Sequence, residues 1–152
     1  MFFQIKTSDR DKYLSLLNES GFPINGSGWW VKYPKRAVEE LYRMLSSTNA
    51  RITHKQNKMI FKEEISNNFG TRFSISIEAQ DFPFKMPKVF LEKPNVKSIG
   101  AKHVWKDGSL CLMDPVYYHS SMSILEIRNL SAAWCFCIES FAYTGKWPAA
   151  EH

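Results

Sequence analysis

Apolar and polar side chains alternate without interruption between residues 72 and 79. The apolar positions are Phe73, Ile75, Ile77 and Ala79. A period of two is typical of a strand that buries one face and exposes the other to water. Further strand candidates occupy residues 51–54, 58–65 and 88–92, with polar turns at 56–57 and 67–70. Consecutive strands with such short turns predict an antiparallel meander.

Two helices are predicted before the strands. The first covers residues 9–20, with Ser8 as its cap and Gly21 at its end. The second begins at Pro34, whose missing N–H is harmless in a first turn. Its expected buried residues are Val38, Leu41, Tyr42 and Leu45, and its expected outer residues are Lys35, Arg36, Glu39, Glu40 and Arg43. That outer face is predicted to be either solvated or a docking surface for an upstream protein.

A long helix is predicted to close the chain after a loop-rich stretch from 94 to 119. Ser123 and Glu126 stand at the spacing of a capping box, and Gly145 and Pro148 are expected to end the helix. Between them lies an apolar stripe that can cover the sheet, made of Ile124, Ile127, Leu130, Trp134, Cys137, Ile138 and Phe141. The predicted fold class is α+β, a four-stranded antiparallel meander packed against N-terminal and C-terminal helices.

The composition is that of one globular domain. The chain has 152 residues, of which 44% are hydrophobic and 23% are charged, and a chain of this length can bury a sizeable core. Its apolar runs are only a few residues long, so we expect no membrane span and no membrane partner. The N-terminal residues carry neither a basic leader nor a small-residue cleavage site, which predicts a cytoplasmic protein.

The formal net charge of +5 raises the possibility of a nucleic-acid partner. The basic residues are spread along the chain, however, without an arginine-rich tract, a zinc-ligand quartet or an aromatic RNA-binding signature. The same charge suits a protein partner with an acidic surface. The pattern therefore argues against nucleic acid as the main ligand.

Three cysteines, Cys111, Cys135 and Cys137, are too few for a disulfide framework, so reduced thiols are predicted. Cys135 and Cys137 have no second Cys or His pair at ligand spacing, and we expect no metal site. The chain also lacks a glycine-rich phosphate loop, and we expect no nucleotide cofactor.

Two segments are more specific. The first is Phe82-Pro83-Phe84-Lys85-Met86-Pro87, in which two prolines end the alternating strand and form a rigid connector to the next one. The second spans residues 103–112 and contains a tight turn at Asp107-Gly108. In it Leu110 and Leu112 can both point into the core, which would turn the thiol of Cys111 outward.

In this order, the two segments resemble those of ubiquitin-conjugating (UBC-like) enzymes. The first is similar to the family's Tyr-Pro-x-x-Pro-Pro stretch, with Phe82 in place of the tyrosine and Met86 in place of a proline. The second shares the ending Gly, any residue, an aliphatic residue, Cys and Leu, with His103 upstream. The short active-site segment and the chain's last residues are closer to bacterial members, some of which belong to cyclic-oligonucleotide anti-phage (CBASS) systems.

The resemblance covers roughly residues 34–143. It implies a UBC-like fold in which residues 34–152 form the catalytic domain and residues 1–33 an N-terminal helical extension, together one compact unit. It also implies that Cys111 carries an acyl group as a thioester. Lys102, Lys106 and His103 lie close in sequence and could stabilise its thiolate. Without the resemblance, the favoured interpretation of Cys111 is a small buried hydrophobic residue.

The other implied site residues each have a second interpretation. The family's His-Pro-Asn is replaced by His103-Val104-Trp105, so the oxyanion needs other donors, either backbone N–H groups at 112–114 or the side chain of His119. His119 could instead cap the last helix with its neighbouring serines. Asp114 could hold or deprotonate an incoming lysine, or could be a turn residue before Pro115. His103 is expected to support the loop by hydrogen bonding and not to act as a general base.

The leading hypothesis is an acyl (aminoacyl) transferase with a cysteine nucleophile, which takes the C-terminus of a protein partner and passes it to an amine. The resemblance implies a ubiquitin-like protein or, in anti-phage defence, a cGAS-like nucleotidyltransferase as that partner, with an activating enzyme upstream. The alternative is a catalytically inactive binding module of the same fold. A nucleic-acid-binding domain is the third hypothesis.

Overall fold

Four strands form a single antiparallel sheet in this computed structural model, which describes residues 2–67, 69–95 and 103–148. The strands are β1 (Arg51–Lys55), β2 (Lys58–Ser66), β3 (Arg72–Gln80) and β4 (Lys88–Lys93). Their order in the sheet is β1-β2-β3-β4, which confirms the predicted meander. Gln56 and Gly70 adopt positive φ values in the two predicted turns. Asn68, in the second turn, lies outside the described residues.

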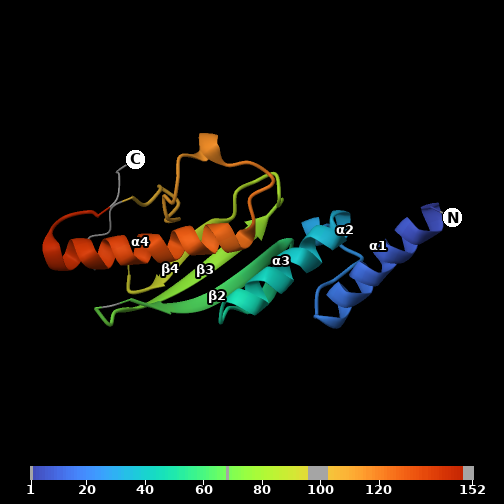
Figure 1. Ribbon diagram of the computed structural model, residues 1–152, viewed down its shortest axis with the longest axis horizontal. Coiled ribbons are helices and arrows are strands. Elements are labelled where there is room, and N and C mark those ends of the chain that lie inside the picture. Colours follow the sequence, from blue (N-terminus) through green and yellow to red (C-terminus); the bar gives the residue numbers. More distant parts are fainter. Residues whose placement is uncertain (1, 68, 96–102, 149–152) are drawn as a thin grey trace.

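Helices stand at both ends of this strand sequence (Figure 1). α1 (Phe2–Glu19), α2 (Trp29–Lys32) and α3 (Pro34–Ser47) precede the sheet, and α4 (Ile124–Thr144) follows it. α4 lies along one face of the sheet, and α3 lies beside the N-terminal end of α4. α1 extends to the far end of the molecule (Figure 1). The arrangement is the predicted α+β, UBC-like one. No helix in the described ranges has the length and apolar character needed to cross a bilayer.

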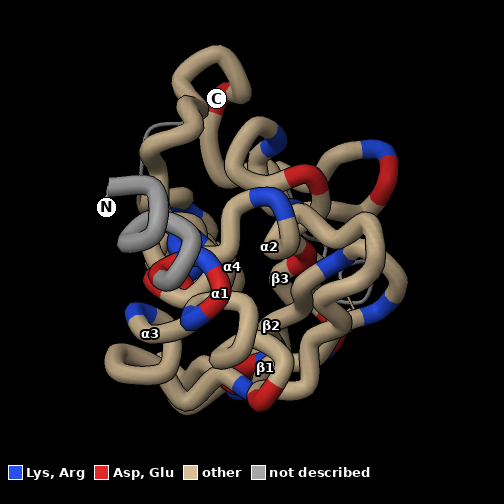
Figure 2. Tube along the Cα trace, turned by 90° about the vertical axis from the view of Figure 1, so that its right-hand side faces the viewer, with Lys and Arg blue, Asp and Glu red and all other residues tan. Residues whose placement is uncertain are grey.

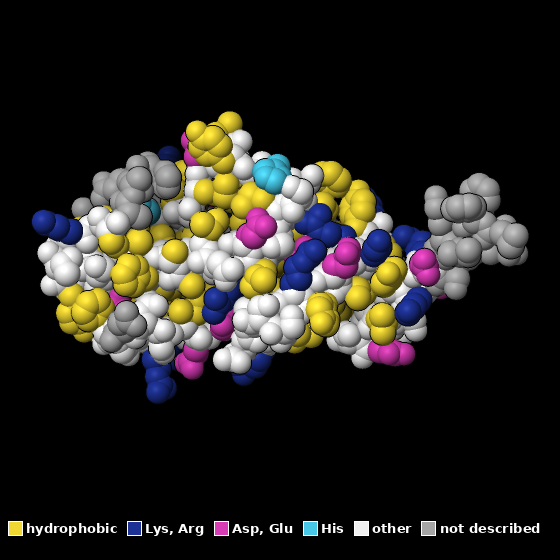
Figure 3. All heavy atoms as spheres, in the orientation of Figure 1, with side chains coloured by type: hydrophobic (Ala, Val, Ile, Leu, Met, Phe, Trp, Pro, Cys, Tyr) yellow, Lys and Arg dark blue, Asp and Glu magenta, His cyan; other side chains and the backbone are white. Residues whose placement is uncertain are grey.

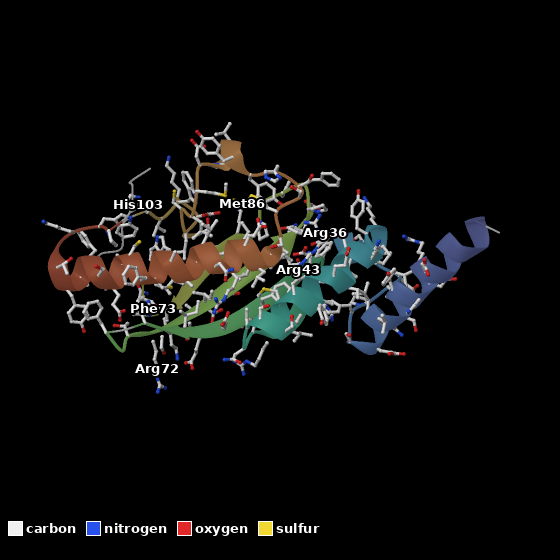
Figure 4. The ribbon with its side chains drawn as sticks, viewed as in Figure 1. Arg36, Arg43, Arg72, Phe73, Met86 and His103 are labelled. Carbon is white, nitrogen blue, oxygen red and sulfur yellow. The ribbon has the colours of Figure 1, made fainter. Side chains whose placement is uncertain are left out.

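One hydrophobic core lies between the sheet and the helices. The alternating residues of β3 behave as predicted: Phe73, Ile75, Ile77 and Ala79 are all buried. Figure 4 shows Phe73 directed toward α4 and Arg72 directed away from it. Trp29 and Trp30 of α2 belong to the same core, and Trp29 Nε1 donates a hydrogen bond of 3.1 Å to Ala79 O. The segment before α3 is thereby attached to β3.

α1 begins earlier than predicted. It starts at Phe2, so Ser8 lies inside the helix and not at its cap. Neither glycine nor proline interrupts residues 2–19, and a helix without such a breaker can extend past a potential capping residue. Its end is as predicted, because Gly21 follows with a φ of 94°.

The buried face of α3 differs from the predicted one. Tyr42 and Leu45 were expected in the core, but their side chains are 72% and 61% exposed. The buried positions are instead Pro34, Ala37, Glu40, Leu41 and Met44. Glu40, expected on the outer face, is completely buried, and this rotates the buried stripe by about one position around the helix.

Glu40 tolerates burial because its carboxylate has three donors. Arg36 Nε and Arg43 Nη1 donate to Oε2 at 3.0 and 2.8 Å, and the backbone N–H of Ile124 donates to Oε1 at 2.6 Å. A buried charge is normally kept only when it is paired and hydrogen-bonded in this way. Figure 4 shows Arg36 and Arg43 where α3 meets the N-terminal end of α4. Glu40 thus joins the two helices.

α4 begins and ends as predicted. Ser123 is its N-cap and accepts a hydrogen bond from Glu126 N at 3.0 Å, and Gly145 ends it with a φ of 75°. Of the predicted stripe, Leu130 and Phe141 are only partly buried, and the other residues are buried. Because Ser123 occupies the cap, the alternative in which His119 caps this helix is wrong.

Candidate active site

Cys111 ends a small hairpin that is attached to β4. Within the hairpin, Val104 pairs with Leu110 in an antiparallel bridge, and Cys111 N donates to His103 O at 2.8 Å. Leu110 N donates to Val89 O of β4, also at 2.8 Å. The hydrogen bonds on either side fix the backbone that carries the thiol, which gives the preorganisation that a nucleophile needs.

The turn of this hairpin is held by Asp107, a residue that the sequence analysis assigned only to a turn. Its Oδ1 accepts hydrogen bonds from Ser109 N and Oγ at 2.9 and 2.6 Å, and its Oδ2 accepts one from Lys88 Nζ at 2.8 Å. These bonds hold the pKa of Asp107 well below its usual range. The local signal was the Asp-Gly-Ser order, which is typical of an aspartate that bonds the backbone two residues ahead.

The side chain of Cys111 lies between two buried leucines. Leu110 and Leu112 are 2% and 9% exposed, whereas Cys111 is only partly buried, as expected for a thiol directed outward. It opens on a cavity of about 410 Å³ that is lined by His103, Val104, Trp105, Cys111, Asp114 and Pro115. All three cysteines are free, and Cys135 and Cys137 are buried. Cys111 is therefore the accessible thiol among them.

Burial and one neighbouring carboxylate determine the electrostatic surroundings of Cys111. Partial burial, and secondarily the carboxylate of Asp114, raise the pKa of the Cys111 thiol. Neither His103 nor Lys106 is among the causes of this shift, so their stabilisation of the thiolate stays a prediction. Lys102 lies outside the described residues.

A raised thiol pKa is compatible with a carrier of acyl groups. Burial penalises the charged thiolate but not a neutral thioester. An acyl group exchanged between two thiols leaves the more acidic one more readily. A thiol of raised pKa would therefore retain such a group against a thiol of ordinary pKa.

Asp114 combines a structural contact with a position on the cavity wall. It is the N-cap of a short 3-10 helix, η1 (Pro115–Tyr117), and its Oδ1 accepts a hydrogen bond from Val116 N at 3.1 Å. Its interpretation as a turn residue is thus confirmed. The side chain is exposed and faces the same cavity as Cys111, so a second role toward an amine stays a prediction.

Substituting Asp114→Asn should make Cys111 more reactive at neutral pH. The amide oxygen can still accept from Val116 N, but the negative charge that raises the thiol pKa is lost, so the thiolate fraction increases. We expect alkylation by iodoacetamide to be roughly two- to fivefold faster, as the removal of one partly screened charge allows. At a pH where the thiol is fully ionised, wild type and variant should converge. Equal rates at neutral pH would contradict the assigned cause.

The two histidines are placed differently. His103 lines the Cys111 cavity with a backbone φ of 61°, and its ring packs on Trp147 at a centroid distance of 4.6 Å. The ring contact fixes the position of His103 in the cavity wall, and the hydrogen bonding expected of its side chain stays a prediction. His119 is exposed, hydrogen-bonds through Nδ1 to Ser121 Oγ, and is absent from the cavity wall formed by the described residues. The structure therefore brings His103 and Asp114 to Cys111, and leaves His119 outside.

Backbone N–H groups next to Cys111 remain available for an oxyanion. In the described part of the chain, the N–H groups of Leu112, Met113 and Asp114 have no hydrogen-bond acceptor, whereas that of Cys111 is used by His103. Backbone donors that need not be reoriented are the usual means of stabilising a tetrahedral intermediate. Of the two substitutes for the missing asparagine, the geometry favours these groups over His119.

The proline connector packs beside the segment that follows Cys111. The hydroxyl of Tyr118 donates to Pro83 O at 2.6 Å, and burial is the main cause that raises the Tyr118 pKa to about 12. Phe82 is completely buried, with Trp29 at 4.9 Å between ring centroids and Arg36 Cζ at 4.9 Å from its ring centroid. The connector thus contacts the loop that follows Cys111, and the hydrogen bond from Tyr118 anchors this loop.

The described residues contain no group of three or more His, Cys, Asp and Glu side chains placed to hold a metal ion.

Comparison with known proteins agrees with the architecture. No curated protein and no solved structure gives a significant match to the chain. A family model described as Type II CBASS E2 protein matches residues 36–152. The match covers the sheet, the connector, the Cys111 hairpin and α4, and it confirms the resemblance to bacterial UBC-like proteins of anti-phage systems. The chain belongs to the Type II CBASS E2 protein family.

Proposed function

We propose that Cys111 accepts the C-terminal acyl group of a protein as a thioester and transfers it to an amine. Family membership supplies the wider setting, a role in CBASS anti-phage systems. The observation that carries the chemical proposal is the placement of Cys111. Its partly exposed thiol opens on a cavity beside Asp114, next to three backbone N–H groups that have no acceptor among the described residues.

Loading of Cys111 is an exchange between thiols. The sulfur of Cys111 attacks the carbonyl carbon of a thioester held by an upstream activating enzyme, and the new S–C bond replaces the old one. The upstream thiol leaves and takes up the proton that Cys111 loses, so the exchange as a whole creates no net charge in the partly buried site. An oxyanion forms after Cys111 attacks and before the upstream thiol leaves, and the N–H groups of residues 112–114 can donate hydrogen bonds to it.

Discharge repeats the same chemistry with an amine. The attacking nitrogen forms a C–N bond as the S–C bond breaks, and Cys111 leaves as a thiolate that takes a proton. An amine must be neutral to attack, although most lysine side chains are protonated at neutral pH. The exposed carboxylate of Asp114 can attract the ammonium form to the cavity and accept a proton from it.

Exposed apolar side chains lie in the cavity wall and in η1, which begins at that wall. Trp105, Val116 and Tyr117 are 43%, 75% and 72% exposed. η1 stands at the top of Figure 1, and Figure 3 shows hydrophobic side chains gathered in the same region. Large apolar groups in such positions suit contact with a protein. They support an extended protein C-terminus as the donor, and a nucleotidyltransferase of the same CBASS system is the partner that we favour.

A binding module without chemistry is the second candidate. The family's His-Pro-Asn is missing at residues 103–105, and the raised pKa of Cys111 lowers its thiolate fraction. Basic and acidic positions are interspersed along the chain (Figure 2), a distribution that suits a protein partner in either case. The preorganised thiol, and neighbouring N–H groups without an acceptor in the described part of the chain, favour the enzyme.

The test is intact-mass spectrometry of the protein purified from its native host without reducing agents. A protein-sized adduct that thiol treatment removes is expected, and its mass identifies the partner. Cys137→Ala is the matched control, because it removes a buried thiol and should retain the adduct. A bare mass together with a co-purifying partner would favour the binding module.

A further inference from the structure

A second cavity, of about 240 Å³, lies between the C-terminal half of α4 and the start of β3. It is lined by Thr71, Phe73, Pro94, Ile138, Glu139, Ala142 and Tyr143. None of these residues lines the Cys111 cavity. The volume greatly exceeds the ~30 Å³ share of one water molecule and is below the roughly 300–1,000 Å³ of drug-sized sites. It therefore suits a group the size of one side chain.

Glu139 gives this cavity a carboxylate that has no ion-pair partner among the described residues. Its side chain is almost completely buried, with a residue exposure of 2%, and Oε2 accepts a hydrogen bond from Thr71 N at 2.9 Å. Oε1 has no hydrogen-bond partner among the described residues, and no cation among them forms an ion pair with the carboxylate. Arg128, which lies on the same helix, is committed to Glu63 at 2.7 and 2.8 Å.

The burial of such a group calls for an explanation. Buried carboxylates are costly unless they are paired, and the few unsatisfied ones in folded proteins tend to have a functional cause. Glu40 in the same chain shows the ordinary solution, since two arginines and a backbone N–H satisfy it. Glu139 has one backbone donor and a cavity beside it.

The walls of the cavity complement this charge. Phe73 and Ile138 are apolar and buried, and Tyr143 is 63% exposed. Tyr143 stacks on Phe69 with ring centroids 4.6 Å apart and an angle of 16° between the rings. A cavity with apolar and aromatic walls and one carboxylate suits a ligand with an alkyl chain that ends in a cationic group.

We propose that this cavity binds a primary alkylammonium group, the chemistry of a lysine side chain, with its nitrogen hydrogen-bonded to Oε1 of Glu139. An ammonium is favoured over a guanidinium because Oε2 is already occupied by Thr71 N. A guanidinium prefers two oxygens in a bidentate arrangement, whereas an ammonium is a point charge that one oxygen can receive. The ligand is either a lysine of a protein or a free amine.

Titration of the full chain, followed by ¹H–¹⁵N NMR at the Thr71 and Ala142 amides, tests the site. The probe is Nα-acetyl-lysine methylamide, and its neutral match is Nα-acetyl-norleucine methylamide. We expect saturable shifts with the first and none with the second. Cadaverine, a free diamine, distinguishes the sources: tighter binding than the lysine derivative indicates a small amine, and weaker binding indicates a protein lysine.

Two variants complete the test. Glu139→Gln keeps an acceptor for Thr71 N but loses the charge, and should weaken binding of the lysine probe by about tenfold or more. Ala142→Phe, at an exposed position, should block the cavity without changing Glu139, and serves if the glutamine variant is unstable. Equal shifts with both probes, no saturable shift with the lysine probe, or wild-type affinity in both variants would overturn the proposal.

Discussion

Replacing Cys111 with alanine is expected to abolish conjugation and leave the fold intact. The thiol is the only group in the cavity that can form a thioester, so product formation should fall by at least roughly a thousandfold, as when a covalent nucleophile is removed. The side chain is partly exposed, so the free energy of unfolding should change by less than about 1 kcal/mol. Conjugation is followed with the activating enzyme and partner supplied, and stability by urea unfolding.

Cys111→Ser separates the chemistry from binding. A serine oxygen can accept the acyl group as an oxygen ester, which resists thiol treatment and is a poorer donor to an amine. We expect the partner to accumulate on the serine variant as a thiol-resistant adduct, or not to load at all. Cys137→Ala should conjugate at the wild-type rate. If Cys111→Ala conjugated at that rate too, the assignment of the nucleophile would be wrong.

Local patterns predicted the strands, the start and end of α4, and the outward direction of Cys111. The alternation at residues 72–79 has one interpretation on a half-buried sheet, because shifting by one residue would expose all four apolar side chains. The leucines on either side of Cys111 act in the same way, since both need the core and the residue between them must face out. Such predictions succeed because each depends on neighbouring residues alone.

The error in the buried face of α3 has a different cause, which is contact with a distant segment. Glu40 can be buried because the N–H of Ile124, 84 residues later in the chain, donates a hydrogen bond to it. The spacing of residues within α3 does not predict that donor. With Glu40 inside, Tyr42 and Leu45 turn outward. Residues near in sequence can also lie apart in space, as His119 does from Cys111.

The candidate active site also combines features set by neighbouring residues with features set by distant contacts. Asp107-Gly108 predicted the turn of the hairpin. The ion pair between Asp107 and Lys88, however, depends on the pairing of the hairpin with β4. The contact of Trp147 with His103 has no signal in the sequence at all. Likewise, the unpaired oxygen of Glu139 is visible only after α4 is packed on β3.

Substituting Glu40→Ala is expected to lower the free energy of unfolding by about 2–4 kcal/mol. The N–H of Ile124 would lose its acceptor at a buried helix end, at a cost of roughly 1–3 kcal/mol. Arg36 and Arg43 would lose a charged partner, but their side chains are 25% and 45% exposed and can be hydrated, so their share is small. For a chain of this size the midpoint of thermal unfolding should fall by roughly 5–15 °C.

The effect of Glu40 should extend to the active site, because Arg36 also holds the segment that follows Cys111. Its Nη1 and Nη2 donate to Ser120 O and Met122 O at 2.9 Å each. Glu40→Gln, which can still accept from Ile124 N, should lose less stability than Glu40→Ala, and Glu39→Ala, on the exposed side of the same turn, should change it by less than about 0.5 kcal/mol. Equal stability of Glu39→Ala and Glu40→Ala would show that the joint between α3 and α4 does not depend on this carboxylate. Slower conjugation by a folded Glu40→Gln variant, with unchanged alkylation of Cys111, would show that the joint positions the loop around the thiol and does not alter the thiol itself.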